Sequence, residues 1–181
     1  MYSTDGLKPP SHRIKAIYEF LPALTGGSPD ETNSLSDAKQ VLQLPITTLA
    51  YVGDAWYEWQ LRRALLREHR GPSGGINQAS AFFSSASFQA YLFDSFEKAC
   101  DGTEANLLRR ARNHKSRSTP KHGEIQAYRL ATAVEALLGF WVLSDKEERA
   151  LKLLHNAWAD ASAAWSESKR MFITREVQDD K

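Results

Sequence analysis

The chain has a single cysteine and no long uninterrupted apolar run. Cys100 therefore has no partner for an intramolecular disulfide, which fits a reducing compartment. The most apolar stretch, ATAVEALLGFWVL, is interrupted by Glu135 and is too short to span a bilayer. The N-terminal sequence MYSTDGLKPPSHRIK lacks the apolar core of a secretory signal. We therefore expect a cytoplasmic protein.

The chain also lacks an excess of charge of either sign. Its 23 basic and 22 acidic residues leave a formal net charge of +1, so overall charge favours no class of partner. No stretch alternates apolar and polar residues as a half-buried strand would. The five histidines lack the spacing of a zinc site, and GPSGG at 71–75 lacks the length and the lysine of a P-loop. These absences argue against β-rich folds, zinc sites and P-loop chemistry.

Helical periodicity is what the chain does have. It predicts short helices over 12–24 and within 36–44, then a long helix from Ile46 to about His69. Two helices follow between 76 and 100, one ends near 112, one spans 124–143, and a last one follows it. With 42% hydrophobic residues, the chain can bury the core of one domain. We expect an all-α fold with three parts: a partly disordered N-terminal extension with one short helix over 1–40, the folded domain over 41–170, and a frayed C-terminal tail over 171–181.

Local signals predict where these helices begin. Pro45 suits the first turn of the long helix, where its missing N–H costs nothing. Ser87 is the candidate cap of the helix that ends near residue 100, and Thr103 is the candidate cap of the next. Ser144 and Glu147 have the spacing of a capping box for the last helix.

Two carboxylates stand in apolar surroundings. Asp54 lies within LAYVGDAWYE, and Glu135 interrupts the apolar helix over 124–143. Such charges are costly unless a basic side chain, a hydrogen-bond network or a metal ion pairs with them. Carboxylate oxygens suit Mg²⁺, which keeps several waters and takes one or two protein carboxylates with phosphate oxygens. A shared metal site and buried ion pairs, Asp54 with Arg129 or Glu135 with Arg62, are both open. Glu58 falls on the Asp54 stripe at i+4.

A second concentration of polar chemistry lies at 109–123, RRARNHKSRSTPKHG, which holds six lysines and arginines and no acid. Its small hydrogen-bonding residues predict a loop, and a basic loop suits phosphate contacts. The absence of interleaved aromatics argues against a platform for stacking single-stranded bases. A solvated cationic loop without a ligand is the alternative. Four cations of this stretch, Arg112, Lys115, Arg117 and Lys121, are here called the basic segment.

Three motifs, in the expected order, carry a resemblance to a known family. LAYVGDAWYEWQLRRALL, RARNHKSRSTPK and AYRLATAVEALLGFWVL followed by KEERALKLL resemble the mini-ribonuclease III family over about residues 44–157. Its members are small bacterial endoribonucleases with a ribonuclease III catalytic domain and no separate double-stranded-RNA-binding domain. The resemblance implies an all-α, ribonuclease III-like endonuclease domain, a homodimer, and trimming of the ends of the large-subunit ribosomal RNA precursor.

The resemblance also implies residue roles. Asp54, in GDA, matches the catalytic aspartate, and Glu135, in VEALLG, matches the metal-binding glutamate. The basic segment matches the part placed against RNA. Full-length ribonuclease III has further acidic residues at the positions of Thr47 and Thr132. Mini-ribonucleases III also lack acidic residues there. With fewer acidic ligands at the site, a mechanism with two metal ions is in doubt. The lysine that the family usually carries around residues 85–87 is absent, which puts one RNA contact in doubt.

Large aromatic residues support the homodimer. They exceed what a small helical domain readily buries alone, and each strand of a duplex needs its own active site. A twofold-symmetric dimer meets both needs. The residues concerned are Trp56, Trp59, Phe82, Phe83, Phe88 and Trp141.

The sequence thus predicts a Mg²⁺-dependent endoribonuclease that cleaves double-stranded RNA and matures large-subunit ribosomal RNA ends. In this hypothesis Asp54 and Glu135 hold Mg²⁺, Glu58 holds a metal-bound water, and the basic segment binds phosphates of A-form RNA. A ribosomal protein bound to the substrate is left open as a further partner. Two alternatives remain: a non-catalytic RNA-binding or ribosome-assembly factor with the same fold, and a helical protein-interaction module with a solvated basic loop.

Overall fold

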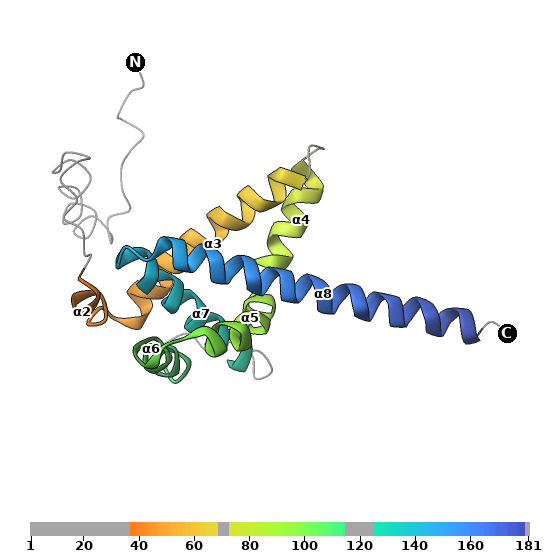
Figure 1. Cartoon of the computed structure of the whole chain (residues 1–181). Coiled ribbons are helices and arrows are strands. Elements are labelled where there is room, and N and C mark those ends of the chain that lie inside the picture. Colours follow the sequence, from red (N-terminus) through yellow and green to blue (C-terminus); the bar gives the residue numbers. More distant parts are fainter. Residues whose placement is uncertain (1–36, 69–72, 115–124, 180–181) are drawn as a thin grey trace, which may run out of the picture. The chain divides into compact units, whose positions relative to one another are not determined.

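The computed structural model describes residues 37–68, 73–114 and 125–179, and within these ranges it holds helices and no strand. The predicted all-α fold is confirmed. The predicted helix over 12–24 lies outside the described residues. The helices in chain order are α2 (Ala38–Val41), α3 (Ile46–Glu68), α4 (Ser73–Phe83), α5 (Ala86–Ala99), α6 (Gly102–Arg112), α7 (Ile125–Leu143) and α8 (Glu147–Asp179) (Figure 1).

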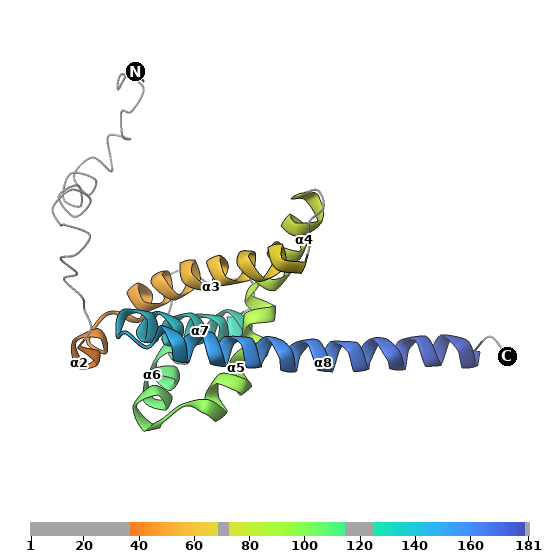
Figure 2. The same ribbon diagram turned by 45° about the horizontal axis from the view of Figure 1, so that its top comes forward.

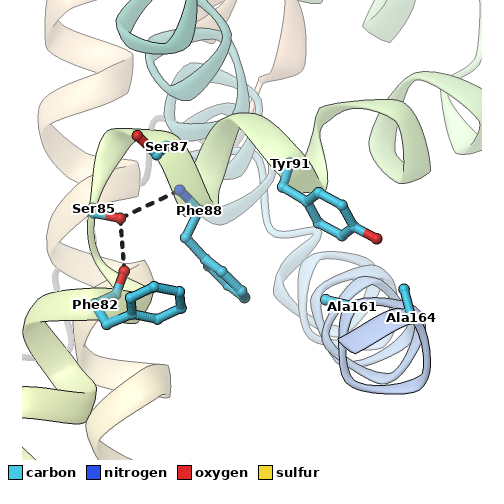
Figure 3. Close-up of a pocket in the computed structure, with 7 residues that line it drawn as sticks. All are labelled: Phe82, Ser85, Ser87, Phe88, Tyr91, Ala161 and Ala164. Carbon is cyan, nitrogen blue, oxygen red and sulfur yellow. Dashed lines mark hydrogen bonds between the residues drawn. The ribbon is translucent and has the colours of Figure 1, made fainter. Parts of the chain in front are cut away.

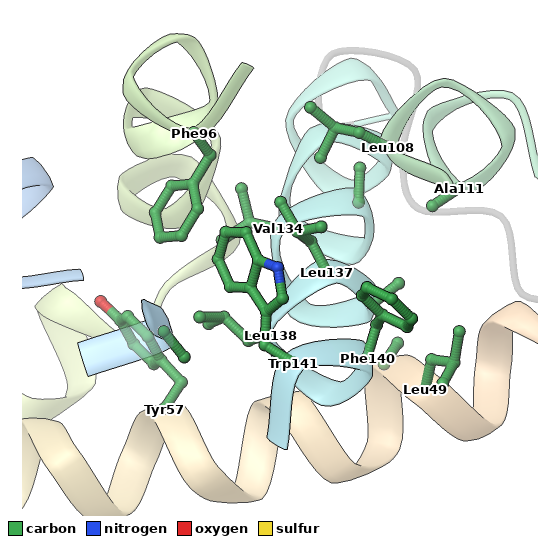
Figure 4. Close-up of a cluster of buried hydrophobic side chains, with 14 of the residues drawn as sticks. Leu49, Tyr57, Phe96, Leu108, Ala111, Val134, Leu137, Leu138, Phe140 and Trp141 are labelled. Carbon is green, nitrogen blue, oxygen red and sulfur yellow. The ribbon is translucent and has the colours of Figure 1, made fainter. Parts of the chain in front are cut away.

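Helix α7 forms the centre of the core. It packs against α3, α5, α6 and α8, which is why it is apolar on most sides. Figure 4 shows its side chains meeting those of α3, α5 and α6. Val134, Leu137 and Trp141 have no measurable exposure, and burial of each such side chain contributes about 1.5–3 kcal/mol. The helix that carries Glu135 is therefore held rigidly from several sides.

Two glycines let α3 and α7 touch backbone to backbone. A Cβ atom added to Gly53 would overlap the carbonyl oxygen of Glu135, and one added to Gly139 would overlap that of Leu49. Only glycine fits at either position of this crossing. Because Asp54 follows Gly53, the close approach brings Asp54 beside the turn of α7 that carries Glu135.

The caps of α5 and α6 differ from those predicted. Ser85, not Ser87, caps α5, and its hydroxyl accepts a hydrogen bond from the Phe88 N–H at 3.3 Å. Asp101, not Thr103, caps α6. Its carboxylate accepts from two backbone N–H groups, which a threonine hydroxyl at position 103 cannot reach, and Glu104 completes a capping box.

The predicted capping box at the start of α8 is absent. The Ser144 hydroxyl donates instead to the Phe140 carbonyl and so closes the end of α7. Asp145 adopts a left-handed conformation with φ 56°, and the Lys146 N–H bonds to the Trp141 carbonyl at 2.8 Å. This is the Schellman arrangement of a helix C-terminus. Ser144 therefore serves the helix before it rather than the helix after it.

Helix α8 runs further than the sequence predicts. A frayed tail was expected over 171–181, but the helix continues to Asp179. No proline or glycine interrupts the stretch from Glu147 to Asp179, so no breaker ends the helix earlier. Figure 2 shows α8 extending past the helices that it packs against.

Candidate active site

The crossing of α3 and α7 brings the two predicted carboxylates together. Burial and, to a lesser extent, the negative charge of Asp54 raise the pKa of Glu135, an interaction with Gln89 lowers it, and together they leave this pKa at about 7. The two carboxylates are therefore close enough to influence each other electrostatically. That they form one metal site stays a prediction.

Asp54 forms the solvent-facing side of the site. Its side chain is exposed, whereas Glu135 is half-buried. Partial burial raises the pKa of Asp54, and the charge of Glu58, one helical turn later, raises it further. Glu58 itself is bound by Arg62, with 2.6 Å between guanidinium nitrogen and carboxylate oxygen. Asp54, Glu58 and Glu135 thus lie near one another, and among the described residues only Glu58 has a basic partner.

The structure does not form the ion pairs that the sequence left open. Among the described residues, Asp54 makes no ion pair with Arg129, and Arg62 pairs with Glu58 rather than with Glu135. Within the part of the chain that the structure describes, Asp54 and Glu135 therefore have no basic partner, and a divalent cation would neutralise their charge. No group of three or more histidine, cysteine or acidic residues that could hold a metal occurs in the described ranges. A site of two carboxylates matches Mg²⁺, which keeps several waters.

Glu104 shows how this fold treats a structural carboxylate. Glu104 as a whole is 1% exposed. Its oxygens accept from the Trp141 indole at 2.8 Å and from Arg149 at 3.0 and 2.6 Å. Burial raises its pKa, but hydrogen bonds from Arg149, the Asp101 backbone and Trp141 outweigh this and leave the pKa below its ordinary value. Glu104 is thus paired and ionised, the opposite of Glu135.

Part of the basic segment is described. Arg112, at the end of α6, places its guanidinium 5.9 Å from the centre of the Phe93 ring and 4.0 Å from a Glu97 carboxylate oxygen. Its side chain remains 42% exposed, so it can also contact a ligand at the C-terminal end of α6. Lys115, Arg117 and Lys121 lie outside the described residues. The RNA-binding role of the segment stays a prediction.

Sequence reasoning missed one residue at the site. Gln89 on α5 is 1% exposed and interacts with Glu135. A signal was available, since position 89 lies three and four residues before the buried Leu92 and Phe93 and so belongs to the inner face of α5. A polar residue at a core position usually has a polar partner, and for Gln89 that partner could have been sought on a neighbouring helix.

A separate apolar cavity of about 330 Å³ lies where the α4–α5 turn faces α8 (Figure 3). Phe82, Phe88 and Tyr91 line one side, and Ala161 and Ala164 line the other. Ser85 and Ser87 also line this cavity. None of the lining residues is charged, so the cavity is distinct from the carboxylate site.

Comparisons with known proteins show the family of the chain. The family model for the ribonuclease III domain matches residues 47–146, a range that holds both Asp54 and Glu135. The chain is 34% identical over 124 residues to the Mini-ribonuclease 3 of Thermoanaerobacter sp. (strain X514), which covers 68% of this chain and 87% of that relative. The chain belongs to the mini-ribonuclease III family. It is accordingly a ribonuclease III-type endoribonuclease, and the resemblance drawn from its three motifs is confirmed.

Further relatives fit the same family. The Mini-ribonuclease 3 of Brevibacillus brevis is 36% identical over 111 residues, which is 61% of this chain and 83% of that relative. A solved X-ray structure of a Fusobacterium nucleatum protein matches with a TM-score of 0.55 at 26% identity, over 59% of this chain and 87% of that one. The helices in the described part of the chain include none that is both long and apolar enough to span a membrane.

Proposed function

We propose that the protein uses Mg²⁺ to cut double-stranded RNA, that it matures the ends of the large-subunit ribosomal RNA precursor, and that it works in the cytoplasm. The observation that carries the metal-dependent activity is the pair of uncompensated carboxylates at the α3–α7 crossing. Asp54 opens to solvent, and burial together with Asp54 raises the pKa of Glu135 to about 7. Apart from Gln89, whose interaction lowers that pKa, the described surroundings offer these charges no compensation.

Asp54 and Glu135 would hold the ion. A divalent ion so held activates water and neutralises the charge that develops at a phosphodiester. Asp54, on the open side, is the carboxylate that an RNA backbone reaches first. Glu58 is fixed beside it by Arg62 and is suited to accept a hydrogen bond from water at the edge of the site.

Two features support double-stranded RNA as the substrate: the cations of the basic segment and the pairing of two copies of the chain. A-form RNA is recognised mainly through its shape and backbone, which requires cations more than base-reading side chains. A duplex has two strands, and a twofold dimer presents one site to each. The structure modifies the argument for the dimer, because Trp56 and Trp141 are buried within one copy. Large apolar residues that stay exposed still support it: Tyr51 at 79%, Trp59 at 59% and Leu66 at 58% on α3.

A cleavage assay tests this function. The purified protein should cut a perfectly paired RNA duplex in Mg²⁺, leave the same strand uncut when it is single, and stop when the metal is chelated. Binding of the duplex without cleavage would instead support the non-catalytic assembly factor. Sequencing of ribosomal RNA ends in a strain depleted of the protein tests the substrate: unprocessed large-subunit ends are expected, and normal ends would exclude this role.

A further inference from the structure

Gln89 is an unusual residue for its place in the fold. It lies on the face of α5 that packs against α7, among Leu92, Phe93 and Phe96, and it is 1% exposed. Its side-chain nitrogen has no hydrogen-bond partner of ordinary geometry within the described residues. A buried amide without a partner destabilises the fold. A leucine or methionine would fill the same space without that cost, so packing alone does not explain a glutamine.

The amide of Gln89 is buried on the side of α5 that packs against α7, the helix that carries Glu135, and the presence of Gln89 lowers the pKa of the Glu135 carboxyl. We propose that Gln89 is a positioning residue for the metal site: its amide N–H donates to the Glu135 carboxylate and holds it toward Asp54. Three helices would then build the site, with Asp54 from α3, Glu135 from α7 and the orienting group from α5. Groups that hydrogen-bond a metal ligand in this way fix its orientation and commonly change metal affinity by about 10–100-fold.

The chemistry of an amide suits this position. Gln89 carries no charge, so it can restrain Glu135 without neutralising the carboxylate that the metal needs. A lysine or arginine in its place would form an ion pair and compete with the cation. The hydrogen bond also satisfies the buried donor, so the bond that orients the ligand removes the cost of burying the amide. This inference rests on the proposed metal site at Asp54 and Glu135.

The test separates positioning from packing. Gln89→Met keeps the length of the side chain, fills the same space and removes the donor, so the melting temperature of the metal-free protein should change little. Metal affinity, followed as the rise in melting temperature with Mg²⁺ or Mn²⁺, should weaken by about 10–100-fold. Cleavage should recover at saturating metal, which a purely structural defect would not allow.

Matched variants complete the design. Gln60→Met removes a buried glutamine on α3, 5% exposed, that is bonded to Arg63, and it should leave metal affinity unchanged. Gln89→Asn retracts the amide by one carbon while keeping it polar, and should show the same loss as Gln89→Met. Unchanged affinity in both Gln89 variants, or a loss that only follows unfolding, would overturn the inference. If Asp54→Asn and Glu135→Gln also bind metal normally, the proposed metal site itself fails.

Discussion

Replacing Glu135 with glutamine should stabilise the metal-free protein above neutral pH. The environment raises the pKa of Glu135 from 4.5 to about 7. Below 4.5 the group is protonated in both the folded and the unfolded chain. As pH rises, the unfolded chain loses the proton first, so the free energy of unfolding falls until pH passes the folded pKa. At 1.36 kcal/mol per pKa unit, the wild-type protein loses about 3 kcal/mol between pH 4.5 and pH 8. Glutamine cannot ionise and avoids this loss.

The assay is thermal or urea unfolding in a chelator from pH 4.5 to pH 8.5. The stability of Glu135→Gln relative to wild type should rise with pH by about 3 kcal/mol, or roughly 6–12 °C in melting temperature. Added Mg²⁺ should stabilise the wild type and not the variant. Glu148→Gln, an exposed carboxylate at the start of α8, is the matched control and should show no such trend. A difference that does not vary with pH would refute the reasoning. So would a loss of about 3–5 kcal/mol in the variant, which a buried ion pair predicts.

Three further predictions concern packing, RNA binding and assembly. Gly53→Ala should destabilise the protein by about 3 kcal/mol or more on denaturant unfolding, because its Cβ would overlap backbone of α7, whereas Gly102→Ala, with nothing within 4 Å, should be neutral or slightly stabilising. Neutralising the basic segment should reduce the slope of log affinity for duplex RNA against log salt concentration by somewhat under one unit per lost phosphate contact. The melting temperature should stay nearly unchanged. An unchanged slope would mean that the segment is only solvated. Light scattering should find a dimer that Trp59→Glu weakens, and an active monomer at working concentration would exclude the dimer.

The sequence indicates the two candidate site carboxylates because each is unusual among its neighbours in the chain. Asp54 and Glu135 are charges inside apolar helical patterns, and that mismatch can be recognised without knowing how the helices pack. The resemblance to mini-ribonucleases III then pairs them. The bounds of α3 and α7 are also predictable to within a few residues, because periodicity and breakers such as Pro45 are local signals.

The features that the sequence leaves hidden depend on packing. Nothing in the local pattern shows that Gly53 and Gly139 face each other, or that Gln89 meets Glu135, because these contacts join distant helices. The cap errors have a different origin. Ser144 can serve the helix before it or the helix after it, and only the turn at Asp145 decides between them.

Single-turnover cleavage by Asp54→Asn tests the central claim most directly. The variant keeps the size and hydrogen bonding of the side chain and removes the charge that would hold Mg²⁺. With the duplex pre-bound and folding verified by its melting temperature, the account predicts that cleavage falls by about 10³-fold or more while duplex affinity is retained. Cleavage at the wild-type rate would contradict the assignment of Asp54 to the metal site.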